Sequence, residues 1–285
     1  MKTMILYPSD YFSIKKVDAD YEYEYREAVR FPDFDIVFYN YDEFVSSGRL
    51  AFYPHSLEAG ICIYRGWMLK PEQYAQLYGK LLEQGAVLVN SPEEYRNCHE
   101  FPNIYERIKD VTPGITVFGP DEPVDWARVK ARYSRFFIKD FVKSVKGTGF
   151  PACFDSGYTD RQLDEYLARF KELRGSLLDG GIVIKEFVDL AKVDGITNEY
   201  RAFILEGRAV SVTANSNQGA SRPRVPMEFV NSLTGLDSHF YTVDFAERAD
   251  GTWIVIETGD GQVSGLSPDQ YVFKFYEEIA NCKKQ

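Results

Sequence analysis

Acidic residues follow directly on a strongly apolar segment near the end of the chain. Residues 253–256 are large and apolar, and Glu257 and Asp260 come next, among three glycines. A charged group buried without a partner is costly, so carboxylates at the end of a buried strand need a counter-charge. The segment therefore predicts a cation site that contains Glu257. Asp260 is a candidate for a further ligand.

Another acid, Asp244, lies on the preceding apolar segment. If Asp250 and Gly251 form a two-residue hairpin turn, residues whose numbers sum to 501 face each other, and Asp244 lies opposite Glu257. Opposed Cβ atoms are about 4.5 to 5.5 Å apart, so the two carboxylates would repel unless one is protonated or a cation binds between them. Oxygen-only ligands favour Mg²⁺ or Mn²⁺. A register shifted by one residue would instead leave both acids solvated on different faces.

A lysine- and glycine-bearing segment occupies residues 136–150, FFIKDFVKSVKGTGF. Lysine suits a phosphate oxygen as a compact charge, and glycine lets backbone N–H groups approach it. The spacing is not that of a Walker loop, and an ordinary hairpin with exposed lysines would contain the same residue types. The candidate phosphate-binding residues are Lys139, Lys143, Lys146, Gly147 and Gly149.

Two further segments combine apolar runs with charged residues. In GGIVIKEFV an apolar strand is interrupted by Lys185 and Glu186, and in NEYRAFIL the residues Glu199 and Arg201 share one strand face. In one interpretation, Glu199 binds a ribose hydroxyl and Arg201 binds a phosphate. A surface ion pair on an edge strand is the other.

The elements that must position these residues change character along the chain. Short apolar runs in the first 70 residues predict strands of an α/β lobe, followed by a helix from Pro71 to Gly85, a strand at 86–90 and a helix capped by Ser91. This order favours a parallel sheet. A helix is expected from about 160 to 173. The C-terminal half is rich in hairpin signals and is predicted to be antiparallel.

Bulk properties exclude several classes of protein. The chain has 285 residues, 45% apolar residues and a net charge of -10, without a long Lys/Arg cluster, so no nucleic-acid partner is expected. No apolar run approaches the roughly 20 residues of a membrane span. Four scattered cysteines and three histidines argue against zinc and disulfides and favour a reducing, cytoplasmic location.

The order of these segments resembles the ATP-grasp superfamily, and ETGDGQVSGL together with YRGWML is most similar to its R-to-K clade. The resemblance implies an α/β plus α+β protein with the ATP-grasp fold, in which an N-terminal α/β lobe precedes two α+β lobes that clamp ATP. The expected bounds are 1–90 for the first lobe, 91–180 for the central lobe with the glycine loop, and 181–285 for the lobe with the metal site.

The resemblance also implies roles for single residues. ATP and Mg²⁺ (or Mn²⁺) are the expected cofactors: Lys139 would contact the phosphates, with the KGTGF segment as a mobile loop over them. Lys185, Glu186 and Val188 would border the adenine, Glu199 would hold the ribose, and Arg201 would bind phosphate or the intermediate. Asp244 and Glu257 match the metal-binding acids. Many family members have asparagine where Gly259 stands here, and Asp260 is expected to replace it. Family members usually have a further phosphate-binding lysine upstream of these segments. Arg107 and Lys109 are the candidates for that position.

The implied reaction joins a carboxylate to an amine through an acyl phosphate. The expected partners are small-molecule or peptide carboxylate and amine substrates, and a homodimer is considered as well. Arg65 is expected to bind a substrate carboxylate with two nitrogens of its guanidinium group. Arg222 and Arg224 are expected on a loop that either becomes ordered over the substrate or is merely solvated. The alternatives are a phosphotransferase on the same fold and a catalytically silent nucleotide-binding module that acts through a partner.

Overall fold

The computed structural model describes residues 2–145, 147–215 and 225–282, and it divides into two compact units. The first unit combines Met1–Cys98, Tyr200–Val243 and Gly259–Gln285. The second unit combines His99–Glu199 with Asp244–Thr258. Each unit is thus assembled from segments that are far apart in the sequence.

The first unit contains a mixed sheet with the strand order β4-β3-β1-β5-β6, to which β2 adds beside β1. Strands β1, β3, β5 and β6 run parallel to their neighbours, whereas β2 and β4 run antiparallel. The strands are β1 (Thr3–Asp10), β2 (Ser13–Val17), β3 (Phe34–Tyr39), β4 (Phe52–Tyr53), β5 (Gly60–Tyr64) and β6 (Ala86–Leu88).

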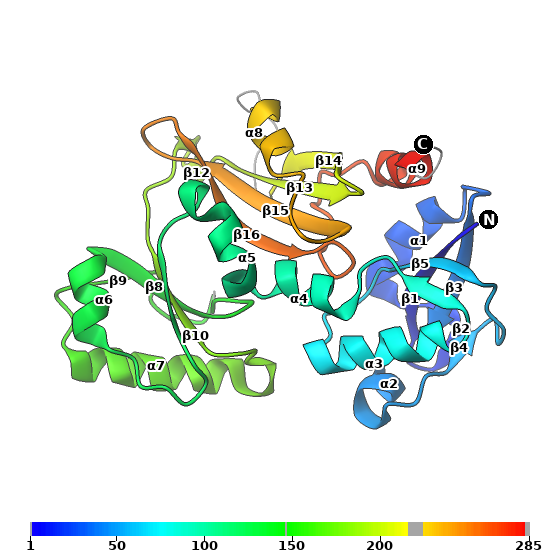
Figure 1. Cartoon of the computed structure of the whole chain (residues 1–285), viewed down its shortest axis with the longest axis horizontal. Helices are drawn as coiled ribbons and strands as arrows, with labels where there is room; N and C mark the ends of the chain where they lie inside the picture. Colours follow the sequence, from blue (N-terminus) through cyan, green and yellow to red (C-terminus); the bar gives the residue numbers. More distant parts are fainter. Residues whose placement is uncertain (1, 146, 216–224, 283–285) are drawn as a thin grey trace. The chain divides into compact units, whose positions relative to one another are not determined.

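Helices cover both faces of this sheet because alternate residues of its central strand point to opposite sides. Met4 and Leu6 pack with α2 and α3, while Ile5 and Tyr7 pack with α1 and α9 (Figure 1). The helices of this part of the chain are α1 (Glu22–Ala28), α2 (Tyr41–Ser47), α3 (Pro71–Leu82), α4 (Pro92–His99) and α9 (Val272–Cys282).

The second unit contains an antiparallel sheet with the order β7-β10-β8-β9. Helices α6 and α7 lie beside this sheet in Figure 1. An aromatic-rich core joins them to it. The elements are α5 (Phe101–Ile108), β7 (Ile115–Phe118), α6 (Trp126–Arg132), β8 (Arg135–Asp140), β9 (Phe154–Asp155), α7 (Asp160–Arg174) and β10 (Ile182–Glu186).

The rest of the chain forms a two-stranded sheet and a second antiparallel sheet with the order β14-β13-β15-β16. The tip of the β15–β16 hairpin, Asp244–Thr258, belongs to the second unit, and its base belongs to the first. The elements are β11 (Lys192–Val193), β12 (Ile196–Thr197), β13 (Glu199–Leu205), β14 (Arg208–Ala214), α8 (Met227–Ser232), β15 (Phe240–Glu247) and β16 (Trp253–Asp260).

The predicted change from a parallel N-terminal sheet to antiparallel C-terminal sheets is confirmed. Local signals explain the element ends: Thr159 and Gln162 form a capping box at the start of α7, and Ser91 Oγ accepts from the Glu94 N–H at the start of α4. The predicted lobe boundary at 180 divides β10 from β7 and β8, although β10 is hydrogen-bonded to both. Pairing between distant segments, which sequence order does not reveal, determines this sheet.

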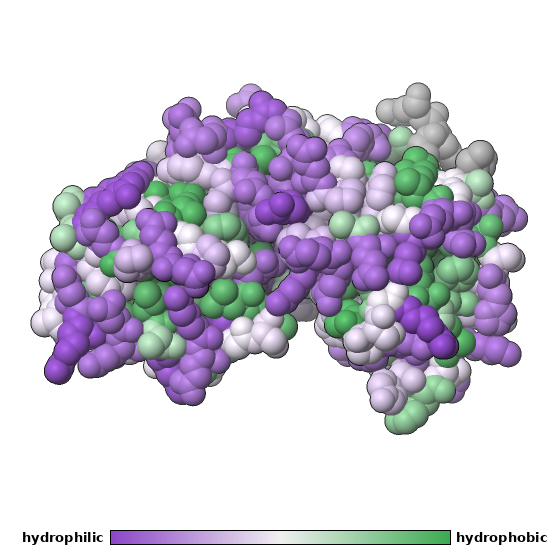
Figure 2. All heavy atoms as spheres, turned by 60° about the horizontal axis from the view of Figure 1, so that its bottom comes forward, coloured by the Kyte–Doolittle hydropathy of each residue, from purple (hydrophilic) through white to green (hydrophobic). Residues whose placement is uncertain are grey.

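No helix within the described ranges is long and apolar enough to cross a membrane. In the face drawn in Figure 2, hydrophilic residues dominate and apolar residues form separate patches.

Candidate functional site

A pocket of about 370 Å³ lies in the second unit, beside the end of β10. Its size falls in the range of small-molecule sites. Four residues predicted to bind a nucleotide line it, namely Lys185, Glu186, Val188 and Glu199. The Thr197 hydroxyl donates to the Glu199 carboxylate, which fixes that acid at the pocket wall. The structure therefore brings the predicted adenine and ribose residues together around one cavity.

A second pocket of about 350 Å³ shares Phe137 and Phe187 with the first and is lined by Gly147. Gly147 and Gly149 have φ angles of +74° and +72°, a region that favours glycine, and a Cβ added at either would meet open space. Glycine is thus required here by backbone conformation and not by crowding, as expected for a loop that approaches a ligand. Lys146 lies outside the described residues.

Two lysines project from the same face of the second unit's sheet. The strand register pairs Lys139 with Val183, and Lys185 with Phe137, so both side chains point to the side on which Phe137 lines the two pockets. Each lysine is only 2% exposed. Sequence analysis predicted both residues, but it did not predict that they would share a buried face.

Each buried ammonium group has an oxygen acceptor. Lys139 Nζ donates to Glu257 Oε1 at 2.7 Å, and Lys185 Nζ donates to the carbonyl of Ile256 at 2.5 Å. Both acceptors come from β16, the strand that carries the predicted metal-binding acid. The predicted phosphate-binding lysine and the predicted metal-binding glutamate are therefore direct neighbours.

The charges in this cluster alter one another's ionisation. Burial alone would raise the pKa of Glu257, but Lys139 and Lys143 lower it to about 2. Burial and the charge of Lys139 place the pKa of Lys185 well below its usual value, despite a smaller opposing effect of Glu257. Burial together with Lys143 lowers the pKa of His99 to about 3. At neutral pH the cluster therefore contains an ionised carboxylate and an uncharged imidazole.

The position of Lys143 depends on an acid that sequence analysis missed. The Asp140 carboxylate accepts from the N–H groups of Val142 and Lys143 at 2.7 and 2.5 Å, and it pairs with Arg174 at 2.7 Å. Asp140 is fully buried and closes the turn after β8. An aspartate followed by N–H groups two and three residues later is a turn signal that could have identified it.

The hairpin turn between β15 and β16 differs from the prediction. The Arg248 N–H donates to Thr252 O at 2.7 Å and the Gly251 N–H donates to Arg248 O at 2.9 Å, so the turn has three residues, and the predicted two-residue turn is wrong. Gly251 adopts a φ of +85°, which a three-residue hairpin loop requires at its last position.

The opposite end of the hairpin has the predicted register. The Gly261 N–H donates to Phe240 O at 2.9 Å, and a Cβ built on Gly259 would lie 2.9 Å from Thr242 Oγ1. Continued by two residues, this register places Asp244 opposite Glu257. The pairing of β15 with β16 must therefore shift by one residue between Gly261 and the turn. The binding of a metal ion by Asp244 and Glu257 together stays a prediction.

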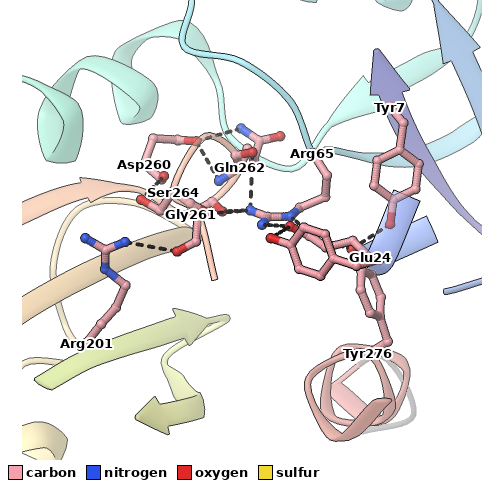
Figure 3. A network of polar contacts seen from close by, with 11 residues as sticks. Tyr7, Glu24, Arg65, Arg201, Asp260, Gly261, Gln262, Ser264 and Tyr276 are labelled. Atoms are coloured by element: carbon pink, nitrogen blue, oxygen red, sulfur yellow. Dashed lines mark hydrogen bonds and ion pairs between the residues drawn. The ribbon is translucent and has the colours of Figure 1, made fainter. Parts of the chain in front are cut away.

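Asp260 is held by hydrogen bonds within the first unit. It is fully buried, and its carboxylate accepts from Asn90 Nδ2 and, at 2.9 and 3.3 Å, from the backbone and side-chain N–H groups of Gln262 (Figure 3). Within the described residues, no group of three or more His, Cys, Asp or Glu side chains could hold a metal ion. These contacts fix the loop after β16, and a metal-binding role for Asp260 stays a prediction.

The ionisation of Asp260 predicts a pH dependence of stability. Burial raises its pKa to about 7, and the hydrogen bonds from Asn90 and Gln262 only partly oppose this rise. The folded state then binds a proton more tightly than the unfolded state, so the free energy of unfolding should fall between about pH 4 and pH 7, by on the order of a few kcal/mol, and level off above. Urea unfolding at a series of pH values should show this slope in the wild type and not in Asp260→Asn. Parallel pH profiles of the two proteins would contradict the assignment.

Arg65 is also held by hydrogen bonds within the first unit. It is 1% exposed, and its Nε and Nη2 donate to Glu24 at 2.9 and 2.8 Å (Figure 3). Its Nη1 donates to the carbonyls of Gly261, at 2.5 Å, and Ser264, at 3.0 Å. Every guanidinium nitrogen thus has an acceptor within the protein, and the binding of a substrate carboxylate by Arg65 stays a prediction.

The remaining predicted residues are placed as follows. In the first unit, Arg201 Nη1 donates to Gly265 O at 2.9 Å, so it lies against the loop after β16 (Figure 3). Lys109, a candidate for the upstream phosphate-binding base, forms an ion pair at 2.9 Å with Glu106, and about half of its side chain is exposed. Arg222 and Arg224 lie outside the described residues.

Comparison with known proteins identifies the family and the fold of this chain. A family model described as ATP-grasp domain, R2K clade family 3, matches residues 127–279, more than half of the chain. No curated protein matches. A RimK domain ATP-grasp protein from Sphaerobacter thermophilus is 15% identical, with 98% of each chain covered and a TM-score of 0.61.

Two solved structures of ligases have the same fold. The D-alanine–D-alanine ligase of Bacillus anthracis in complex with ATP is 14% identical, covering 99% of this chain and 96% of that chain, with a TM-score of 0.60. The ATP-grasp ligase PsnB in complex with a minimal precursor, Mg and ADP is 11% identical, covering 99% and 98%, with a TM-score of 0.58. The predicted ATP-grasp fold is therefore confirmed, and the chain belongs to family 3 of the R2K clade of ATP-grasp domains.

Proposed function

We propose that this protein is an ATP- and Mg²⁺-dependent ligase that joins a carboxylate to an amine through an acyl-phosphate intermediate. The observation that carries the proposal is the arrangement in the second unit, where buried Lys139 contacts ionised Glu257 and the predicted nucleotide residues line the adjacent pocket. Family membership and the shared fold of known ligases support the same reading.

The pocket residues suit a purine nucleotide. The segment from Glu186 to Val188 can offer backbone groups to the edge of the base, and Glu199 can accept from ribose hydroxyls. The side-chain nitrogens of Lys139, Lys143 and Lys185 can donate to phosphate oxygens, and Gly147 and Gly149 let the backbone approach them. The proposed site thus contains a complementary group for each part of ATP.

The donor set near Glu257 fits magnesium. Mg²⁺ is commonly held by one or two carboxylates together with substrate phosphates and water, so a cage of three protein acids is not needed. Glu257 is ionised at neutral pH because of the neighbouring lysines, and Asp244 is the proposed second carboxylate. Bound there, magnesium would neutralise charge that develops on the transferring phosphoryl group.

In the proposed reaction, the substrate carboxylate attacks the γ-phosphorus of ATP, and the bond from that phosphorus to the β,γ-bridging oxygen breaks. ADP leaves, and the acyl phosphate remains. The amine then attacks the acyl carbon, loses a proton and displaces phosphate. The work of the chain is to position the reactants and to stabilise charge: the Lys139 ammonium, held by Glu257, is aimed at phosphate oxygens, so no protein nucleophile is required.

The proposal predicts that MgATP stabilises the protein and that an acyl phosphate can be trapped. Saturating MgATP should raise Tm by several degrees, because a ligand that binds only the folded state shifts the unfolding equilibrium. Amino acids and peptides incubated with ATP, Mg²⁺ and hydroxylamine should yield a hydroxamate and ADP.

The products also separate the competing functions. AMP release would indicate adenylation and contradict the acyl-phosphate mechanism. ADP with a stable phosphorylated substrate would indicate a phosphotransferase, and no Tm shift at millimolar MgATP would exclude the proposed activity. A Tm shift without turnover, across the substrate screen, would favour a silent nucleotide-binding module.

A further inference from the structure

One aromatic ring lies between the two buried lysines and the start of α5. Phe101 is fully buried, and the Lys185 and Lys139 ammonium nitrogens lie 3.7 and 5.1 Å from the centre of its ring. Its backbone N–H donates to Phe141 O at 2.9 Å, which ties the ring to the loop that follows β8. Phe101 thus meets both lysines that the proposed function assigns to the phosphates.

The ring lies beside two lysine side chains whose polar acceptors both come from β16. Lys139 pairs with the Glu257 carboxylate, and Lys185 donates to the uncharged Ile256 carbonyl. The face of a phenyl ring carries a negative partial charge that attracts a cation, most strongly where water is excluded. The ring therefore gives Lys185 a favourable contact beside its hydrogen bond to the Ile256 carbonyl.

We propose that Phe101 is a positioning residue of the nucleotide site, an inference that rests on the proposed function. Its ring face holds the side-chain nitrogens of Lys185 and Lys139 side by side, ready for the phosphates of a nucleoside triphosphate. The ring touches neither the base nor the reacting atoms, and it acts through the two lysines.

The physical reason is the orientation of the two lysine side chains. Without the ring face at 3.7 Å, Lys185 would rotate away, and only a fraction of the molecules would present both lysines to the phosphates. The apparent affinity for the polyphosphate falls in proportion to that fraction. A cation–π interaction in a desolvated site corresponds to about a tenfold or larger effect on such an equilibrium.

Graded fluorination of the ring at position 101 tests this inference. Replacing Phe101 by mono-, di-, tri- and pentafluorophenylalanine weakens the negative ring face stepwise with little change in shape. The Kd of the full-length protein for MgATP, measured by calorimetry, should rise with each fluorine and reach at least about tenfold for the pentafluoro variant. Phe101→Leu, which fills the space without a ring, should show a similar loss.

The matched control is Phe118, which is buried in the same unit and has no cationic contact within the described residues. The same fluorinated residues at position 118 should leave the Kd unchanged, and Tm should vary alike in both series, which separates positioning from packing. A Kd that is flat across the Phe101 series while the wild type binds MgATP would overturn this inference alone. If the wild type binds no MgATP, the proposed function itself fails.

Discussion

Replacement of Glu257 by glutamine is expected to lower the kcat/KM of the proposed ligase reaction by about 1000-fold, with little change in fold. Glutamine retains the shape but removes the charge that holds Lys139 at 2.7 Å and that is proposed to hold magnesium. The remaining activity should no longer depend on the magnesium concentration. The measurement is the rate of ADP release across a magnesium titration, once a substrate is known, or the magnesium dependence of the ATP-induced Tm shift before that.

Glu172→Gln on α7 is the matched control, because Glu172 is an exposed acid of the same unit that pairs only with Arg169 among the described contacts. It should behave as the wild type does. The stability of Glu257→Gln should differ from that of the wild type in a pH-dependent way. Since the folded pKa of Glu257 is lowered to about 2, its contribution is complete above its unfolded pKa and is lost as pH falls toward 2. Wild-type magnesium dependence in Glu257→Gln would show that this acid is not a metal ligand.

Replacement of Arg65 by methionine is expected to lower the free energy of unfolding by about 3 to 5 kcal/mol. The substitution leaves the Glu24 carboxylate buried without its cation and removes the donor to the carbonyls of Gly261 and Ser264. Urea unfolding of the wild type, Arg65→Met, Glu24→Gln and the double variant gives the four free energies of a double-mutant cycle. The double variant should be less destabilised than the sum of the single variants, because it leaves no unpaired charge.

Arg26→Met provides the comparison within α1. Arg26 pairs with Glu22 at the surface, where both side chains are more than half exposed, so its loss should cost less than about 1 kcal/mol. A stable Arg65→Met protein whose only defect is a higher KM for the acid substrate would restore the substrate role predicted from the sequence.

Local order in the sequence was enough to group four of the predicted site residues. Lys185, Glu186, Val188 and Glu199 follow one another along a short stretch of chain, and all of them line one pocket. Lys139 lies at the end of an apolar strand, as its local sequence indicates, whereas the face that it shares with Lys185 follows from the pairing of β8 with β10. The capping signals at α4 and α7 were equally local, and both helices begin where these signals indicate.

The sequence did not reveal the surroundings of residues that contact distant partners. Arg65 has the composition of a substrate-binding arginine, and only the fold reveals that Glu24 and the loop after β16 occupy its donors. Asp260 was assigned to a metal from its nearness to Glu257 in sequence, but Asn90, which is 170 positions away, binds its carboxylate. Phe101 gave no signal at all, because an aromatic residue at a helix start is ordinary until two lysines are placed beside it.

The anchoring of the loop after β16 by Arg65 has a consequence for synthesis on the ribosome. The parallel strands of the first unit emerge early, yet the carbonyls of Gly261 and Ser264 and the hydroxyl of Tyr276, which donates to Glu24 at 2.6 Å, emerge last. A nascent chain that collapsed before these residues left the exit tunnel would bury a charged pair with its partners still missing. We therefore expect the N-terminal sheet to stay loosely packed during translation and to become protease-resistant only when α9 has been made.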